Sequence, residues 1–255
     1  MRFALALSLL CLAPVARASD GDPWIGIEMA PGAHGGVAVK DVVAGAPGEA
    51  ARIVPGDELL AVDGRKLSNP GEIYRAVRTA KVGGHLKLTI LAANGRERAV
   101  DVLLTARPAP EAIQRNSLLR RAAPDFAPSV QAGAKFDKLS SLRGQVVLID
   151  FFATWCGPCV EVMPKIERLH QTLAQKGLKV MGVSSEEPEV VAAAAGRFHL
   201  SYSLVSDANE VITSRYHVFA LPTMVVIDRK GNVREIAISD DEQAERAVRE
   251  LMAEK

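Results

Sequence analysis

Residues 148–159 read LIDFFATWCGPC, and this stretch decides the fold of the second half of the chain. Residues 146–152 are almost all apolar, which is typical of a strand that is buried on both faces of a sheet. A helical pattern follows over about 156–175 and begins with two cysteines, Cys156 and Cys159. The stretch therefore predicts a buried strand that leads directly into a helix, with Cys156 at the junction.

Strands and helices alternate after this unit. Further strands are predicted at 178–184 and 223–228, and helices at 188–198 and 240–254. Such alternation is typical of a layered α/β domain in which part of the sheet is parallel. We assign this domain to residues 123–255.

The first half of the chain has a different pattern. Residues 19–106 carry short apolar runs separated by turns that contain Gly or Pro, with helical spacing at 48–52 and 70–81. They predict a small β-rich (α+β) domain. Residues 107–122 lose this alternation and predict a linker with one short helix near Leu118. The strands expected in the first domain are 24–29, 37–43, 58–62, 86–91 and 99–104.

The N-terminus has the pattern of a secretory signal. Arg2 supplies a positive charge, residues 3–15 form an apolar run, and Ala16-Arg17-Ala18 gives the small-residue pattern of a cleavage site. The run is shorter than the roughly 20 residues that a membrane-spanning helix needs. We expect residues 1–18 to be a cleaved signal that exports the chain to the periplasm, and Cys11 to leave with it. An uncleaved segment that tethers the protein, or a buried helix, is the alternative.

Composition narrows the classes of function. With 48% hydrophobic and 24% charged residues, the chain has the composition of a globular protein. Its formal net charge of +1 gives no reason to expect nucleic acid or an anionic membrane surface as a partner. Function is therefore expected to come from a local site.

The two remaining cysteines, Cys156 and Cys159, indicate redox chemistry. Thiol–disulfide exchange needs one thiolate that attacks a disulfide and a second thiol that resolves the mixed disulfide. At the start of a helix, Cys156 would face unpaired backbone N–H groups and the positive end of the helix dipole. Such surroundings lower a cysteine pKa from about 8.5 to roughly 3.5–7.5. We predict that Cys156 attacks and Cys159 resolves.

A zinc half-site is the structural alternative for this cysteine pair. Zinc would need two further ligands, but no other cysteine follows the signal. The five histidines are not paired at ligand spacing. The sequence therefore predicts no metal and no cofactor other than the cysteine pair itself.

The stretch 148–159 resembles the active-site segment of the thioredoxin superfamily. The motifs around it are similar to those of the exported TlpA/ResA-like branch, which implies a thioredoxin-fold α/β domain with three layers. These motifs are APDF at 123–126, LSSLRG at 139–144, YHVFALPT at 216–223 and IDRKG at 227–231.

This resemblance implies several site residues. Pro222 is expected to follow a cis peptide bond and to lie beside the cysteines, and the backbone of Leu221 to pair with an extended substrate segment. Gly157 and Pro158 are expected to contact the same substrate, a protein disulfide or thiol. Trp155 is expected to shield the attacking sulfur. A plain turn proline is the alternative for Pro222.

Asp150 is the one charged residue in the predicted buried strand. In thioredoxins the matching acid lies below the cysteines and assists proton transfer from the resolving thiol. Burial raises the pKa of a carboxyl, which suits acid–base work near neutral pH. An aspartate at a frayed strand end is the alternative.

One position departs from the ResA-like pattern. Many members of that branch carry a glutamate three residues after the second cysteine, where this chain has Val162, and the adjacent Glu161 is rotated by about 100° around the helix. The narrow substrate preference of the branch is therefore not carried over. The Gly157-Pro158 pair and Asp150 favour a general reductant supplied by a membrane electron donor, with a periplasmic oxidant as the alternative.

The front domain resembles a bacterial PDZ domain of the kind found in exported proteases. The resemblance implies that Ile25, Gly26 and Ile27 form the carboxylate-binding loop and strand, with Ile73 and Val77 on the facing helix. A peptide or protein terminus would add there as a strand. The motifs are WIGI at 24–27, GVAV at 36–39, GAP at 45–47 and GDELLAVDG at 56–64.

Two other functions compete with the redox reductase. A peroxiredoxin would need a Pro-x-x-x-Thr-x-x-Cys pattern, and no proline precedes the cysteine motif, so we set this reading aside. A copper-binding metallochaperone would hold the metal on the two thiols, with His217 and Met224 near the proline loop. Met224 is more simply expected to be a core residue of the following strand, and His217 a loop residue.

Overall fold

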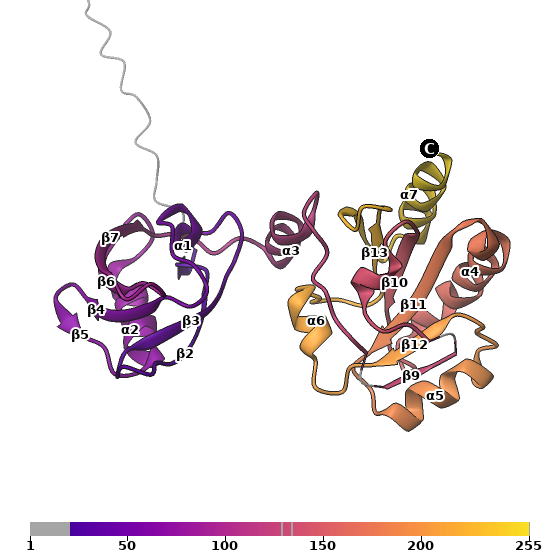
Figure 1. The fold of residues 1–255 in the computed structure, drawn as a ribbon, viewed down its shortest axis with the longest axis horizontal. Helices are drawn as coiled ribbons and strands as arrows, with labels where there is room; N and C mark the ends of the chain where they lie inside the picture. The colour runs from indigo at the N-terminus through magenta and orange to yellow at the C-terminus, as the bar shows by residue number, and fades with distance from the viewer. Residues whose placement is uncertain (1–20, 129, 134, 255) are drawn as a thin grey trace, which may run out of the picture. The chain divides into compact units, whose positions relative to one another are not determined.

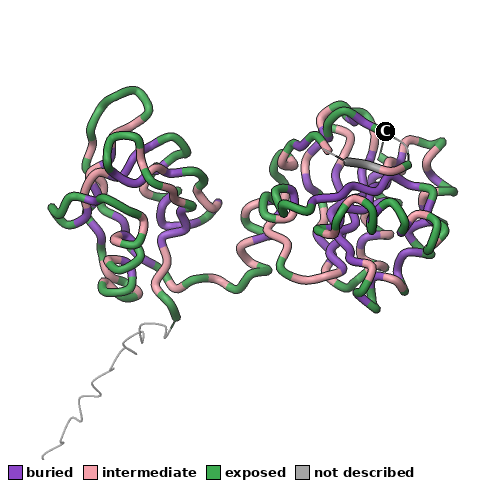
Figure 2. Tube along the Cα trace, turned by 90° about the horizontal axis from the view of Figure 1, so that it is seen from below, coloured by how far each residue is buried: buried purple, intermediate pink, exposed green. Residues whose placement is uncertain are grey.

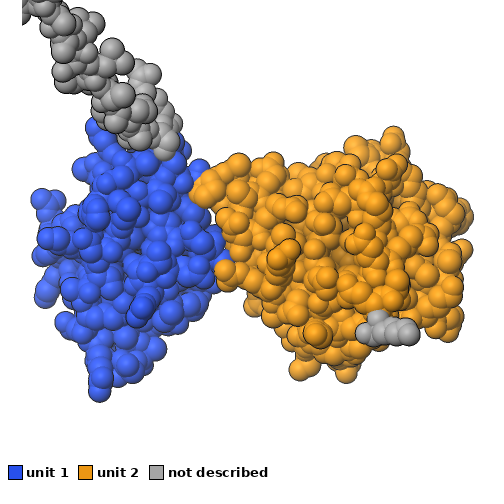
Figure 3. Space-filling model, turned by 90° about the horizontal axis from the view of Figure 1, so that it is seen from above, with its two compact units in different colours: residues 1–107 blue, residues 108–255 orange. Residues whose placement is uncertain are grey.

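The computed structural model describes residues 21–128, 130–133 and 135–254 of the chain. The chain divides into two compact units, residues 1–107 and 108–255 (Figure 3). The predicted signal, residues 1–18 with Cys11, lies outside the described residues. In the part that is described, no helix is both long enough and apolar enough to cross a membrane.

The first unit is built on an antiparallel sheet with two helices, as predicted. Its strands are β1 (Pro23–Trp24), β2 (Ile27–Pro31), β3 (Val37–Val42), β4 (Glu58–Val62), β5 (Arg65–Lys66), β6 (His85–Leu91), β7 (Glu97–Leu103) and β8 (Thr105–Ala106), and its helices are α1 (Pro47–Ala50) and α2 (Pro70–Ala80). The main sheet has the order β2-β3-β4-β6-β7, β5 pairs with β4, and β1 pairs with β8 (Figure 1). Strand β2 is therefore an edge strand of the described sheet.

Alternating side chains form the core of the first unit. In β6, Leu86, Leu88 and Ile90 are buried while the residues between them are more exposed, as expected for a strand with one face on the core. Helix α2 adds Ile73 and Val77, one turn apart on one face. The buried segments run through the interior of the unit (Figure 2).

The second unit contains a mixed six-stranded sheet. Its strands are β9 (Val130–Ala132), β10 (Val146–Phe151), β11 (Leu178–Ser184), β12 (Ser203–Ser206), β13 (Thr223–Ile227) and β14 (Val233–Ile238). Their order is β14-β13-β10-β11-β12-β9. The pairs β10–β11 and β11–β12 are parallel, and the other pairs are antiparallel. Strand β10, which carries the residues before the cysteine motif, lies inside the sheet.

Helices cover both faces of this sheet and complete three layers. The helical segments are α3 (Pro110–Leu118), η1 (Leu139–Leu142), α4 (Gly157–Leu173), η2 (Ala174–Lys176), α5 (Pro188–Arg197), α6 (Val211–Arg215) and α7 (Asp241–Ala253). One core cluster joins the sheet to α4, α5 and α7, and the other joins its opposite face to α3, η1 and α6. The predicted three-layer α/β architecture is confirmed.

The segment assigned from sequence to a linker, 107–122, holds helix α3 against the second unit. The side-chain amide of Gln114 donates a hydrogen bond to the carbonyl of Tyr216 (3.0 Å), and the guanidinium of Arg115 donates to the carbonyl of Ile236 (3.1 Å). Leu118 is buried in the core of that unit. The boundary between the two units accordingly falls between Arg107 and Pro108.

Candidate active site

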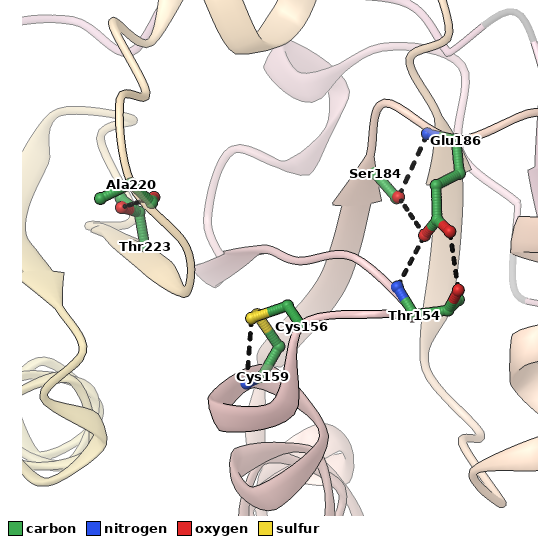
Figure 4. Close-up of a disulfide and its surroundings, with 7 residues drawn as sticks. All are labelled: Thr154, Cys156, Cys159, Ser184, Glu186, Ala220 and Thr223. Carbon is green, nitrogen blue, oxygen red and sulfur yellow. Dashed lines mark hydrogen bonds between the residues drawn. A yellow bond between two sulfur atoms is a disulfide. The ribbon is translucent and has the colours of Figure 1, made fainter.

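Cys156 and Cys159 form a disulfide at the N-terminus of α4 (Figure 4). Cys156 is the N-cap residue, and its sulfur accepts a hydrogen bond from the backbone N–H of Cys159 (3.2 Å). Pro158 occupies the first turn of the helix, where its missing N–H leaves no partner unsatisfied. The predicted location of the cysteine pair, at a strand-to-helix junction, is confirmed.

The two sulfurs differ in access. Cys159 is 1% exposed within the core between α4 and the sheet, whereas Cys156 is 6% exposed and lines an open cleft. A substrate sulfur in that cleft would meet Cys156 first. This difference supports the predicted roles, with Cys156 attacking and Cys159 resolving.

The cleft beside Cys156 has a volume of about 740 Å³. Its walls are largely apolar, and its charged lining residues in the described part of the chain are Glu186 and Glu210. The sequence predicts that Trp155 shields the sulfur, but its side chain is 76% exposed because it lies in the turn between β10 and α4. Trp155 therefore forms part of the cleft wall.

The predicted proline loop borders the same cleft. The peptide bond between Leu221 and Pro222 is cis, as predicted. The hydroxyl of Thr223 donates a hydrogen bond to the carbonyl of Ala220 (2.8 Å), which closes this turn (Figure 4). Leu221 lines the cleft, as do Gly157 and Pro158, whereas Pro222 itself is buried.

A carboxylate that the sequence analysis did not single out holds the loop before the cysteines. Glu186 follows β11, and its side chain accepts hydrogen bonds from the backbone N–H (2.7 Å) and the hydroxyl (2.6 Å) of Thr154 and from the hydroxyl of Ser184 (3.0 Å) (Figure 4). Because β10 and β11 are parallel neighbours, the loops at their carboxyl ends meet at one edge of the sheet. That rule is the signal that could have located Glu186.

Asp150 lies on the sheet face that α4 covers, the face on which both cysteines pack. Its strand neighbours two positions away, Leu148 and Phe152, belong to the same core cluster as Cys156 and Cys159, and side chains two apart in a strand share a face. Asp150 is 1% exposed, and its Oδ1 atom has no hydrogen-bond partner. It is thus a buried carboxyl within the strand and not a residue at a frayed end.

Burial controls the protonation of Asp150. It raises the pKa of this carboxyl to about 7, because the charged form loses its hydration. The residue beside it on β11 is Gly182, where an added Cβ would come within 2.8 Å of the Phe152 ring and 2.9 Å of Leu204. That position has no room for a basic side chain. A carboxyl with these properties can exchange a proton near neutral pH.

The residues considered for copper or for a specialised substrate lie as follows. Met224 is a buried core residue of β13, as predicted, and His217 is half-buried in the turn after α6. No group of three or more His, Cys, Asp and Glu side chains that could hold a metal occurs among the described residues. Val162 lies on the buried face of α4 and packs in the core, whereas Glu161 is exposed.

The peptide-binding residues predicted in the first unit lie on the expected elements. Ile27 begins β2, and Ile73 and Val77 lie on α2. Gly26 has a φ of +72°, and a Cβ there would lie 2.2 Å from that of Ala46, so this loop requires glycine.

The side chains of these residues are nevertheless turned inward. Ile25, Ile27, Ile73 and Val77 all belong to the buried core of the unit. They stabilise the unit in this conformation. Strand β2 is at the edge of the described sheet.

Comparison with known proteins identifies both units. The PDZ domain model matches residues 23–104, and the AhpC/TSA family model matches residues 119–236. Thioredoxin-like protein YneN of Bacillus subtilis (strain 168) is 36% identical over 120 residues, which cover 46% of this chain and 69% of YneN. Thiol-disulfide oxidoreductase ResA of Geobacillus kaustophilus is 35% identical over 115 residues, which cover 45% of this chain and 66% of ResA.

The match extends over about two thirds of the length of these curated relatives. Among solved structures, a putative thiol:disulfide interchange protein DsbE from Chlorobium tepidum is 28% identical, with a TM-score of 0.49, over 54% of this chain and all of that one. The family assignment rests on the sequence matches and on the cysteine site that they contain. The chain belongs to the thioredoxin-fold thiol–disulfide oxidoreductases that include ResA and YneN, and it carries a PDZ domain ahead of the redox domain.

Proposed function

We propose that this protein is exported and reduces protein disulfides with the dithiol form of Cys156 and Cys159. The observation that carries the proposal is the difference in access between the two sulfurs. Cys156 caps α4 and lines an open cleft, while Cys159 lies behind it in the core. An accessible attacking thiolate with a protected resolving thiol is the arrangement that disulfide exchange needs.

The reaction follows from this arrangement. The Cys156 thiolate attacks one sulfur of a substrate disulfide, and the other substrate sulfur leaves as a thiolate that takes up a proton from solvent. Cys159 then gives its proton to Asp150 and attacks the Cys156 sulfur. The second substrate sulfur leaves as a thiolate, so that two electrons pass to the substrate and the Cys156–Cys159 disulfide forms. Asp150 is the proton acceptor in this scheme because it is buried on the same sheet face.

We propose that electrons flow from the cysteine pair to the substrate. Two features of the sequence favour a general reductant. The cysteines are separated by Gly157-Pro158, and Val162 stands where many ResA-like proteins have a glutamate. In an oxidising compartment the disulfide would have to be reduced again after each turnover. A membrane electron donor is the partner we propose for that step, and the secretory pattern of residues 1–18 supports export to the periplasm.

The PDZ unit would supply a second binding function. Strand β2 pairs with β3 on one side and is the edge strand of the described sheet. An extended peptide can add to such an edge through main-chain hydrogen bonds, and a C-terminal carboxylate can bind to backbone N–H groups in a loop. We propose that this unit binds the terminus of a substrate or partner protein.

The reductase activity can be measured with an insulin-type assay. We expect the reduced full-length protein to reduce the disulfides of insulin, and added copper to leave that rate unchanged when the ion is buffered at low concentration. The reason is that the cysteine pair turns over as a dithiol without a metal. Tight copper binding with no disulfide reduction would contradict the proposal and would favour a metallochaperone.

Peptide binding can be tested with the full-length protein and a library of peptides with random C-termini. We expect the enriched peptides to lose at least about tenfold in affinity when the terminal carboxylate is amidated, because a charge-assisted hydrogen bond contributes roughly 1.5–3 kcal/mol. The measurement is a fluorescence titration of each peptide in its two forms. Equal affinity of both forms, or no enrichment, would contradict carboxylate recognition by this unit.

A further inference from the structure

Three buried polar atoms without partners lie on the α4 side of the sheet in the second unit. They are Oδ1 of Asp150, the hydroxyl of Tyr202 and Nδ1 of His170. Asp150 and Tyr202 are each 1% exposed, and His170 is half-buried in the last turn of α4. Two of the three groups are therefore in the core, and the third is partly exposed near the end of α4.

Tyr202 contacts His170 and lies within electrostatic range of Asp150. It directly precedes β12 and belongs to the core cluster that contains the cysteines. Its ring meets the His170 ring edge-on, with 6.1 Å between the centroids. Its hydroxyl is close enough to Asp150 for the charge of that carboxylate to raise the pKa of the phenol, after the larger effect of burial.

Among the described residues, the charged groups that act on His170 are Glu167 and Lys179. Glu167 accepts hydrogen bonds from the backbone N–H of Ser201 (2.8 Å) and from the side-chain amide of Gln171 (2.7 Å), so its carboxylate is already satisfied. Burial and the charge of Lys179 lower the pKa of His170, while Glu167 raises it. The net lowering favours the neutral imidazole of His170, which can accept a proton.

Buried polar atoms without hydrogen-bond partners destabilise a fold. Neighbouring groups of this kind are commonly joined by a shared ordered water molecule. Packing of the core does not need polar groups, yet this cluster contains three, and each has an atom that can accept a proton. A hydroxyl and an imidazole can both accept and donate, and together with water they form a chain that moves protons.

We propose that Tyr202 and His170 form a proton relay, bridged by water, that carries the proton of Asp150 from the core to solvent. The relay rests on the proposed reductase function and extends it with a path for the proton that Cys159 releases. Both residues act through Asp150 and touch neither the substrate nor the reacting sulfurs.

The relay moves one proton and no electrons. Cys159 gives its proton to the Asp150 carboxylate during resolution of the mixed disulfide. The carboxyl then donates through water to the oxygen of Tyr202 as the phenolic proton passes on toward Nδ1 of His170. The imidazole releases a proton to solvent, and the phenol ends the cycle protonated. Burial raises the pKa of Tyr202 well above its usual range, so the phenol does not ionise on its own.

The test uses single-turnover kinetics of the reduced full-length protein with a peptide disulfide, in which attack by Cys156 and resolution by Cys159 are measured separately. For Asp150→Asn we expect resolution to slow by about 100-fold, the effect of losing a general base. For Tyr202→Phe and His170→Ala we expect resolution to slow by at least about tenfold, with the rate of attack unchanged and a larger solvent deuterium effect. Imidazole added to the buffer is expected to restore resolution in His170→Ala.

Matched variants on other surfaces serve as controls. Tyr216→Phe removes a hydroxyl that is buried on the opposite face of the sheet, where it donates to the carbonyl of Pro124 (3.0 Å), and His199→Ala removes an exposed imidazole. Both are expected to keep native resolution rates.

Two results would overturn the relay. One is unchanged resolution in Tyr202→Phe and His170→Ala while Asp150→Asn is slow, which leaves the proposed reductase function intact. The other is an equal loss in the Tyr216→Phe control. Failure of the native protein to react with any disulfide would instead refute the proposed function itself.

Discussion

Cys159→Ser protein is expected to accumulate a mixed disulfide on Cys156, whereas Cys156→Ser protein accumulates none. The attacking sulfur lines the cleft and the resolving sulfur is enclosed, so removal of Cys159 stops the reaction after its first step. Turnover should fall by more than about a thousandfold in either variant, the order of effect seen when a catalytic nucleophile is removed. Non-reducing gels and mass spectrometry of the trapped adducts measure this outcome and also identify the substrates.

The order of roles is what this experiment tests. A double variant, Cys156→Ser with Cys159→Ser, is the control for adducts that form elsewhere on the chain. If the stable adduct formed on Cys159 in Cys156→Ser protein, with none on Cys156 in the other variant, the assigned roles would be reversed. If neither single variant formed an adduct, disulfide exchange would not be the function of this site.

Asp150→Asn is expected to remove much of the pH dependence of stability between pH 4 and pH 8. The pKa of Asp150 is about 7 in the fold and 3.8 in its ordinary state. Because the folded value is the higher one, the folded protein binds more protons than the unfolded chain across this window. Its stability is therefore fully present below about pH 4 and is lost as pH rises to about 7. Three pKa units at about 1.4 kcal/mol each give a loss of about 4 kcal/mol.

Urea unfolding of the oxidised protein at a series of pH values measures this effect, because the disulfide keeps both cysteines from titrating. The free energy of unfolding should decline less with pH in Asp150→Asn, by an amount of that order. Asp207→Asn is the control for removing a buried carboxylate that has hydrogen-bond partners. The Asp207 carboxylate accepts hydrogen bonds from the backbone N–H groups of Ile212 (3.0 Å) and Thr213 (2.7 Å), so we expect this variant to have a lower free energy of unfolding. Parallel curves for native protein and Asp150→Asn would show that Asp150 does not titrate as the fold implies.

The elements with the strongest local patterns were predictable from sequence. Strand β10 is recognisable because all six of its residues are buried, which gives a run that is apolar except for Asp150. Strand β12 was missed because it reads SLVS: its two serines are buried by tertiary contacts that the local sequence does not contain. Strand β14 was missed because it is amphipathic, with Arg234 exposed and Glu235 partly buried. Helix α3 extends further than predicted because it packs on the second unit.

The site residues, too, were predictable only where they lie on one stretch of chain. Cys156, Cys159 and Asp150 lie on one short stretch of chain, and their chemistry is visible in its pattern. Glu186 follows β11 and Tyr202 precedes β12, and only the order of the sheet brings them near that stretch. The inward packing of Ile73 and Val77 was likewise hidden, because helical spacing marks an apolar face without showing what covers it.

The absence of a side chain at Gly182 has a consequence for how this site responds to its surroundings. A neighbouring cation would make the acidity of Asp150 depend on Coulomb attraction, but here burial raises its pKa. Dissolved salt screens exposed charges over distances of about 8 Å and has little access to a buried carboxyl. The proton affinity of this group is therefore set by packing, and it stays the same in dilute and in saline surroundings.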